Sequence, residues 1–206
     1  MEPNHYSSGI IKFLESCKFL SLYVGKSLID YLKNILWNRG YYMEKYLAEY
    51  DVMIPSCLNF TYKELIKSDS AIRHGIKNIP DKRQLKNIQL LAQNVLQPLR
   101  NELGRIRVTS GFRSPELNSL IGGSPTSNHC LGYAADIESL DNISLLELLN
   151  YIYDNLPFKE LIAEFFPDGW VHVAYKENNN NRILKLKDDD HNYKIVTIEY
   201  INSLYK

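Results

Sequence analysis

Two histidines and an aspartate have types and spacing that could do chemistry. His129 and Asp136 stand in the stretch SNHCLGYAADIE, and His172 lies inside the apolar run WVHVAY. Alternate residues of a strand point to one face, so His172 would share a face with Trp170 and Ala174. A histidine there either lines a site or is a core residue with satisfied hydrogen bonds. Together the three residues offer two nitrogen donors and one oxygen donor, a set that suits zinc with its fourth coordination position open.

A carboxylate beside such a metal would complete a hydrolytic site, and Glu164 is the candidate. The segment FPDGW predicts a three-residue hairpin loop, Pro167–Gly169, with a type I turn followed by a left-handed glycine. That register places Glu164 opposite His172. The carboxylate could then take a proton from water and pass it to a leaving amine, while the metal polarises the carbonyl. Asp168 is the competing base, although an aspartate at this place is typical of a turn.

Two further polar residues are candidates for substrate contacts. Arg113, in SGFRSPELN, follows a predicted strand and sits in a glycine turn. Its guanidinium could bind a substrate carboxylate or stabilise an anionic tetrahedral intermediate, or it could form a structural ion pair. Ser127 stands two residues before His129. Its hydroxyl could hydrogen-bond to substrate or cap the loop.

The elements that must position these residues follow from the periodicity of apolar residues. Residues 82–104 form one amphipathic helix that ends at Gly104, and SLLELLNYIYDNL predicts a second helix. RIRVTSG, ELIAEF, WVHVAY, RILKLK and YKIVTIEYI predict strands joined by turn-forming residues. Helices separate from a run of hairpin-linked strands indicate an α+β fold with a central antiparallel sheet and flanking helices.

The chain divides into three predicted segments. Residues 1–54 form an amphipathic helical arm with apolar residues at spacings of three and four. The main domain spans residues 55–181 and begins at Pro55, before a helix that Thr61 would cap. Residues 182–206 form a C-terminal β-hairpin extension. The arm would pack on its own domain or in an oligomer, with a membrane surface as the alternative.

Composition excludes several classes of function. The chain has 24 lysines and arginines against 24 acidic residues, so it lacks the basic surplus of a nucleic-acid-binding protein. The run FLSLYVG is too short for a membrane span. Charged residues interrupt the apolar stretch that a classical signal peptide would need.

The three widely spaced cysteines are expected to be free thiols. GGSPTS does not match the nucleophile elbow of a serine hydrolase.

Several blocks in order resemble the zinc D-alanyl-D-alanine carboxypeptidase family of peptidoglycan peptidases, in its bacterial and phage lysin-like branch. These blocks are FTYKEL, RHGIKNIP, VTSGFRSPELNSLIGG, SNHCLGYAADI and WVHVAY. The resemblance covers about residues 59–175 and implies the fold shared by hedgehog domains and D-Ala-D-Ala peptidases. It leaves the arm and the strands after Arg182 uncovered.

The resemblance also implies a role for each candidate residue. His129, Asp136 and His172 would be the zinc ligands. Glu164 or a nearby acid would be the catalytic base, and Arg113 and Ser127 would contact substrate. One departure concerns the base, because several relatives place the acid three residues before the last histidine, where this chain has Gly169.

The implied activity is hydrolysis of the peptide stems or cross-links of bacterial peptidoglycan, as a D,D-carboxypeptidase or an endopeptidase. Such an enzyme would act at the cell wall or in the periplasm. With no classical signal peptide, it would be phage-encoded and released by lysis or carried by the virion, where the arm could dock on an oligomer or a virion protein. The alternative is a non-catalytic structural or wall-binding protein that retains the peptidase fold.

Overall fold

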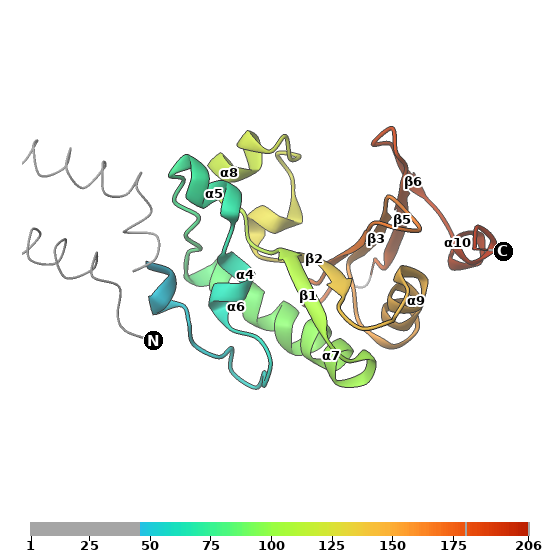
Figure 1. The fold of residues 1–206 in the computed structure, drawn as a ribbon, viewed down its shortest axis with the longest axis horizontal. Helices are drawn as coiled ribbons and strands as arrows, with labels where there is room; N and C mark the ends of the chain where they lie inside the picture. Colours follow the sequence, from blue (N-terminus) through green and yellow to red (C-terminus); the bar gives the residue numbers. More distant parts are fainter. Residues whose placement is uncertain (1–45, 180, 206) are drawn as a thin grey trace, which may run out of the picture.

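The structure, a computed structural model, describes residues 46–179 and 181–205. Its centre is a six-stranded sheet with the strand order β1-β2-β4-β3-β5-β6. The strands are β1 (Ile106–Ser110), β2 (Ala134–Ser139), β3 (Glu160–Glu164), β4 (Trp170–Ala174), β5 (Ile183–Lys187) and β6 (Tyr193–Ile195). Neighbouring strands are antiparallel except for the parallel pair β3–β5. The predicted α+β class with flanking helices is confirmed (Figure 1).

The helix predicted over residues 82–104 is present, with one irregular turn. It consists of α6 (Lys82–Leu91), the π-helical turn η1 (Ala92–Leu96) and α7 (Gln97–Leu103). Asp81 and Gln84 form a capping box at its start, and Gly104 ends it with a φ of 87°. Two short helices precede this segment, α4 (Tyr62–Ile66) and α5 (Asp69–His74). After β1 come the short helix α8 (Pro115–Leu120) and the 3₁₀ turn η2 (Asn128–Leu131).

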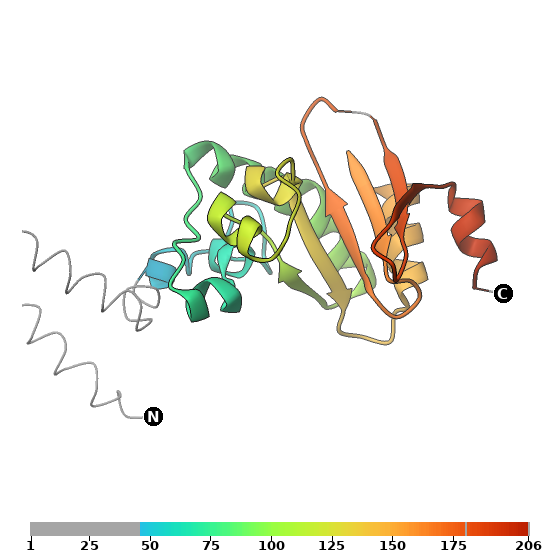
Figure 2. The ribbon, with the colours of Figure 1, turned by 90° about the horizontal axis from the view of Figure 1, so that it is seen from above.

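The two faces of the sheet have different characters. The alternation of β3 and β4 sends Leu161, Ala163, Val171 and Val173 into the hydrophobic core. Helices α6, α7 and α9 (Leu145–Asn155) lie on that side of the sheet, as Figure 2 shows. The residues between them in sequence, including His172, face the opposite side. The polar side chains that could do chemistry are therefore gathered on the face away from these helices.

The hairpin between β3 and β4 differs from the prediction. Glu164 lies opposite Trp170, and Ile162 lies opposite His172, so the expected pairing of Glu164 with His172 is wrong. The connection runs over residues 165–169, and the left-handed residue is Phe165, with a φ of 55°. Gly169 is needed for a different reason, since a Cβ there would lie 1.8 Å from the carbonyl oxygen of Glu164. The longer loop shifts the register by two residues and keeps Glu164 on the predicted face.

The C-terminal segment contains the predicted hairpin but not all of the predicted strand. β5 and β6 pair antiparallel, and β5 also pairs with β3, so residues 183–195 belong to the central sheet. The strand predicted for YKIVTIEYI ends at Ile195. Thr197 caps α10 (Ile198–Ser203), where Ile198 and Ile201 are buried three residues apart on one helical face. Helical packing of these isoleucines prevails over their strand propensity.

The part of the predicted arm that lies within the described residues is short. Leu47 and Ile54 belong to the main hydrophobic core, and Met53 pairs with Thr61 in an isolated bridge. Thr61 caps α4, as predicted. The helices predicted for residues 10–45 lie outside the described residues, and the domain boundaries near 55 and 182 stay predictions. No helix within the described ranges is both long enough and apolar enough to cross a membrane.

Candidate metal centre

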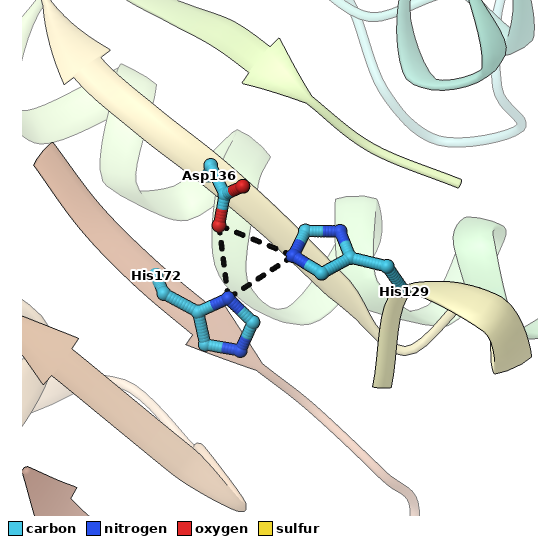
Figure 3. A group of neighbouring side chains, drawn as sticks. All are labelled: His129, Asp136 and His172. Atoms are coloured by element: carbon cyan, nitrogen blue, oxygen red, sulfur yellow. Dashed lines mark hydrogen bonds and ion pairs between the residues drawn. The ribbon is translucent and has the colours of Figure 1, made fainter. Parts of the chain in front are cut away.

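The structure brings His129, Asp136 and His172 together on the polar face of the sheet (Figure 3). His129 Nε2 lies 3.1 Å from Asp136 Oδ1 and 3.1 Å from His172 Nδ1. His172 Nδ1 lies 2.9 Å from the same carboxylate oxygen. Three ligands arranged tetrahedrally about zinc are separated by roughly 3.4 Å, because zinc bonds to nitrogen and oxygen are about 2.1 Å long. The residue types and these separations fit a zinc ion.

His129 is oriented by the carbonyl group of Gly111, just after β1, and by the helix to which its own turn is attached. Its Nδ1 lies 2.7 Å from the carbonyl oxygen of Gly111, so Nδ1 donates a proton and Nε2 keeps its lone pair for a metal. The turn η2 that carries His129 is attached to α6, where Gln84 Nε2 donates to the carbonyl of Cys130. Gly132 ends this turn with a φ of 73° and passes close to Gln84. The long helix therefore fixes the first candidate ligand.

Asp136 and His172 are placed by strand register. They lie directly opposite each other on β2 and β4, where Cβ atoms are about 5 Å apart. Burial alone would raise the pKa of Asp136, but the charges and hydrogen bonds of His129 and His172 hold that pKa well below its usual range. Burial lowers the pKa of His129, against the opposing effect of Asp136. A metal needs ionised carboxylates and neutral imidazoles, and these shifts favour that state for Asp136 and His129.

Arg113 and Ser127 contact the cluster as follows. The Arg113 guanidinium donates to Ser110 Oγ at 2.8 Å and to Asp136 Oδ2 at 2.5 Å. Arg113 thus forms the ion pair that the sequence left open, and it occupies the carboxylate oxygen that does not face the histidines. Ser127 caps η2 by accepting a hydrogen bond from the backbone N–H of His129. The substrate roles of Arg113 and Ser127 stay predictions.

Glu164 and Asp168, the two candidate bases, have different surroundings. Glu164 is buried and pairs with Lys187 of β5, with Oε2 2.7 Å from Nζ. Its register places it diagonal to His172, about 7 Å away at Cβ. Asp168 is exposed in the hairpin loop and lines a small cavity of about 310 Å³ with Leu145 and Leu148 of the helical side. Of the two candidate bases, Glu164 is therefore the buried one on the polar face.

A second acid, Glu160, which was not among the candidates from the sequence, lies beside the cluster. Glu160 Oε1 is 3.7 Å from His172 Nε2. Burial would raise the pKa of Glu160, but its hydrogen bond with Lys185 and the nearby positive charges lower it overall. The alternation that puts Glu164 on the polar face of β3 also puts Glu160 there, because the two residues are four apart. The alternation within ELIAE could therefore have identified Glu160 as a residue of the polar face.

A cleft of about 720 Å³ opens beside the cluster. Arg113, Asp136 and Trp170 line it on the sheet side, and Glu64, Lys67 and Arg107 are among the residues that line the rest. The cleft is large enough for a peptide-sized ligand, since binding sites for small molecules commonly enclose 300–1,000 Å³. A candidate ligand of the metal and a cationic side chain thus face the same open space.

Comparison with known proteins agrees with this geometry. The family model described as Peptidase M15 matches residues 58–174, which is more than half of the chain. The chain belongs to the M15 peptidase family. The match includes His129, Asp136, His172 and both candidate bases. The family predicted from the sequence motifs is confirmed.

One curated relative of this M15 chain is the zinc D-Ala-D-Ala carboxypeptidase of Streptomyces albus G. The two are 37% identical over 82 residues, which cover 39% of this chain and 31% of the relative. The chain therefore spans about a third of the length of that relative. The family, the zinc-dependent relative and the cluster of two histidines and an aspartate together support the expected zinc cofactor. Strand β5, with Lys185 and Lys187, lies beyond the matched region.

Proposed function

We propose that this M15 protein is a zinc peptidase that hydrolyses peptide bonds in the stem peptides or cross-links of bacterial peptidoglycan. The observation that carries the proposal is the group of His129, Asp136 and His172 beside a cleft of about 720 Å³. The relative from Streptomyces albus G supports the substrate class, because its name describes cleavage of D-Ala-D-Ala.

Zinc bound at this site would polarise the scissile carbonyl and lower the pKa of water. The chain supplies the remaining functions. Glu164 is proposed as the general base, taking a proton from the attacking water and passing it to the leaving amine. Its position diagonal to His172 is compatible with action through an intervening water. Arg113 is proposed to bind a carboxylate or stabilise the anionic intermediate, since its guanidinium lines the cleft.

The proposal includes two possible cleavage specificities and a cellular location. Removal of a terminal residue would make the protein a D,D-carboxypeptidase, and cleavage within a cross-link would make it an endopeptidase. The setting is the bacterial cell wall or periplasm, reached as a phage lysin or a virion-associated wall hydrolase. Ser127 would contact the substrate near His129. Each of these points rests on the resemblance of the motifs to wall peptidases.

Mass spectrometry of peptidoglycan fragments tests the activity. Zinc-loaded protein is incubated with purified, muramidase-digested wall, and new peptide ends are identified. Loss of one terminal residue from stem peptides indicates a carboxypeptidase, whereas separation of cross-linked dimers indicates an endopeptidase. Clearing of intact cells added from outside, compared with clearing of isolated walls, tests the lysin setting.

Three variants assign the base in the same assay. Glu164→Gln keeps the size of the side chain and removes the proton acceptor, so cleavage should fall by a factor of about 10² to 10⁴. Asp168→Asn should cleave like the wild type, and Glu102→Gln, an exposed site on α7, is the matched control. Equal cleavage by wild type and Glu164→Gln would move the base elsewhere. Absence of cleavage by zinc-loaded wild type would overturn the proposed activity in favour of a non-catalytic, wall-binding role.

A further inference from the structure

The ring of His172 has one nitrogen at the cluster and one directed away from it. Nδ1 is 2.9 Å from Asp136 Oδ1 and 3.1 Å from His129 Nε2. A metal bound through Nδ1 requires the ring proton on Nε2. Nε2 is buried and makes no hydrogen bond within the described part of the chain. A buried N–H without an acceptor is destabilising, so the site needs a group that can accept this proton.

Glu160 presents a carboxylate oxygen to this nitrogen. Its Oε1 lies 3.7 Å from His172 Nε2, and the two side chains are 16% and 8% exposed. Glu160 of β3 lies opposite Ala174 of β4, so it is the diagonal neighbour of His172 on the polar face. It approaches Nε2, not the ligand atom Nδ1. This position suits an acceptor behind the imidazole and does not suit a base that acts at the metal.

The Glu160 carboxylate is itself held from two sides. Its Oε2 accepts a hydrogen bond from Lys185 of β5. Its Oε1 accepts one from Asn128 Nδ2 at 3.0 Å, and Asn128 Oδ1 in turn accepts one from Lys159 Nζ at 2.6 Å. Asn128 is adjacent to His129 in η2. Glu160 therefore connects the loop of one candidate ligand, the strand of another and the C-terminal extension.

We propose that Glu160 is the positioning residue of His172 and accepts its Nε2–H when Nδ1 binds the metal. The proposal rests on the metal site of the proposed function. Metal-binding histidines usually donate their second ring N–H to a carboxylate, a backbone carbonyl or water, which fixes the tautomer and strengthens the ligand. His129 already has such an acceptor in the Gly111 carbonyl, and Glu160 gives His172 the equivalent.

The proposal gives strand β5 a function in the site. Lys185 lies beyond residue 174, where the family match ends, and its side chain is 26% exposed. Its ammonium donates a hydrogen bond that holds the Glu160 carboxylate in place, and it also lies 6.0 Å from the centre of the Tyr193 ring of β6. The C-terminal extension would thus act on the metal through one lysine and one glutamate.

Metal affinity tests the proposal without relying on peptidase activity. The dissociation constant of zinc is measured by competition with a chromogenic chelator for the full-length wild type, Glu160→Gln, Glu160→Leu, Lys185→Met and the exposed control Glu102→Gln. Loss of an outer partner of a metal ligand typically weakens metal binding 10–100-fold. Glu160→Leu should reach that range. Glu160→Gln, which keeps an acceptor oxygen without its charge, and Lys185→Met should fall between it and the wild type.

Cobalt spectra and two reference variants complete the test. The visible absorption of the cobalt-substituted protein reports ligand geometry, so Glu160→Leu should shift its bands while Glu102→Gln leaves them unchanged. His172→Ala should lose far more affinity than any Glu160 variant. Wild-type affinity and an unchanged cobalt spectrum in folded Glu160→Gln and Glu160→Leu would overturn the proposal. Zinc-loaded wild type without peptidase activity would overturn the proposed function alone.

Discussion

Glu164 and Lys187 form a buried ion pair that joins β3 to β5. Glu164 Oε2 lies 2.7 Å from Lys187 Nζ, and the side chains are 8% and 14% exposed. Burial would lower the pKa of Lys187, but the hydrogen bonds and charges of Glu164 and Tyr193 raise it overall. The positive charge that pairs with the proposed base Glu164 thus comes from Lys187, which lies after residue 174, where the family match ends.

Replacing Lys187 should destabilise the protein through the carboxylate that is left behind. In Lys187→Met, Glu164 stays buried without its cation, a change that typically costs about 3–5 kcal/mol. Urea unfolding measures the free energy of unfolding. Lys194→Met, a change at an exposed lysine of β6, should cost much less. The double variant Glu164→Gln, Lys187→Met should be more stable than Lys187→Met alone; equal stability would show that the unpaired charge is not the cause.

The tight turn before β4 gives a second prediction. A Cβ on Gly169 would lie 1.8 Å from the carbonyl oxygen of Glu164, so Gly169→Ala must displace the backbone at the end of β3. We expect a loss of stability of about 1–3 kcal/mol, as for other overpacked sites. Peptidase activity should fall as well, because Glu164 moves. Thermal unfolding and the fragment assay measure both effects, with Asp168→Ala in the same loop as control. An alanine variant with the stability of the wild type would contradict the close approach.

Much of the fold could be predicted because local signals agree with the final packing. The helix over 82–104 has a capping residue, a regular apolar stripe and a terminal glycine, and all three act within the segment. The C-terminus is the exception, because its local signals are ambiguous. Thr197 is a helix cap, and the isoleucines that follow suit either a strand or a buried helical face. Which of these forms depends on contacts with distant residues.

The grouping of His129, Asp136 and His172 was more predictable than the position of the candidate base Glu164. Strand alternation decides the face on which His172 lies, and it placed Glu164 on the same face. The position along the strand depends on loop length, and the loop runs from Phe165, which has a positive φ, to Gly169, longer than FPDGW indicated. The partners Lys185 and Lys187 could not be assigned, because a parallel pairing of β5 with β3 leaves no turn signal in the sequence.

Asp136→Asn should weaken metal binding. The Asp136 carboxylate faces both histidines through Oδ1 and Arg113 through Oδ2, so the amide would keep the shape and lose the charge at the centre. We expect zinc affinity to fall by more than about 100-fold, the upper end for an outer partner of a ligand. Chelator competition measures this, with exposed Asp154→Asn of α9 as control. Retention of wild-type affinity would exclude Asp136 as a ligand.

The metal-free protein should lose stability as the pH falls below about 6.5. Burial lowers the pKa of His129 in the folded chain, whereas an unfolded histidine titrates near 6.5. Below that pH the unfolded chain binds a proton that the folded chain does not, so protonation favours unfolding. The stabilisation is therefore present above pH 6.5 and is lost as the pH falls toward the lower folded pKa of His129. Asp136, whose folded pKa is also lowered, adds a loss in the same direction below about pH 4.

Urea unfolding of chelator-treated protein between pH 7.5 and 5 measures this effect. His129→Gln removes the titrating group, so the dependence on pH in that window should be much weaker than in the wild type. His74→Gln, a change at an exposed histidine of α5, should retain the wild-type slope. Equal slopes for the wild type and His129→Gln would mean that burial does not lower the pKa of His129 in the folded, metal-free chain. In that case His129 would have to release a proton before a metal could bind to its Nε2 at pH values below about 6.5.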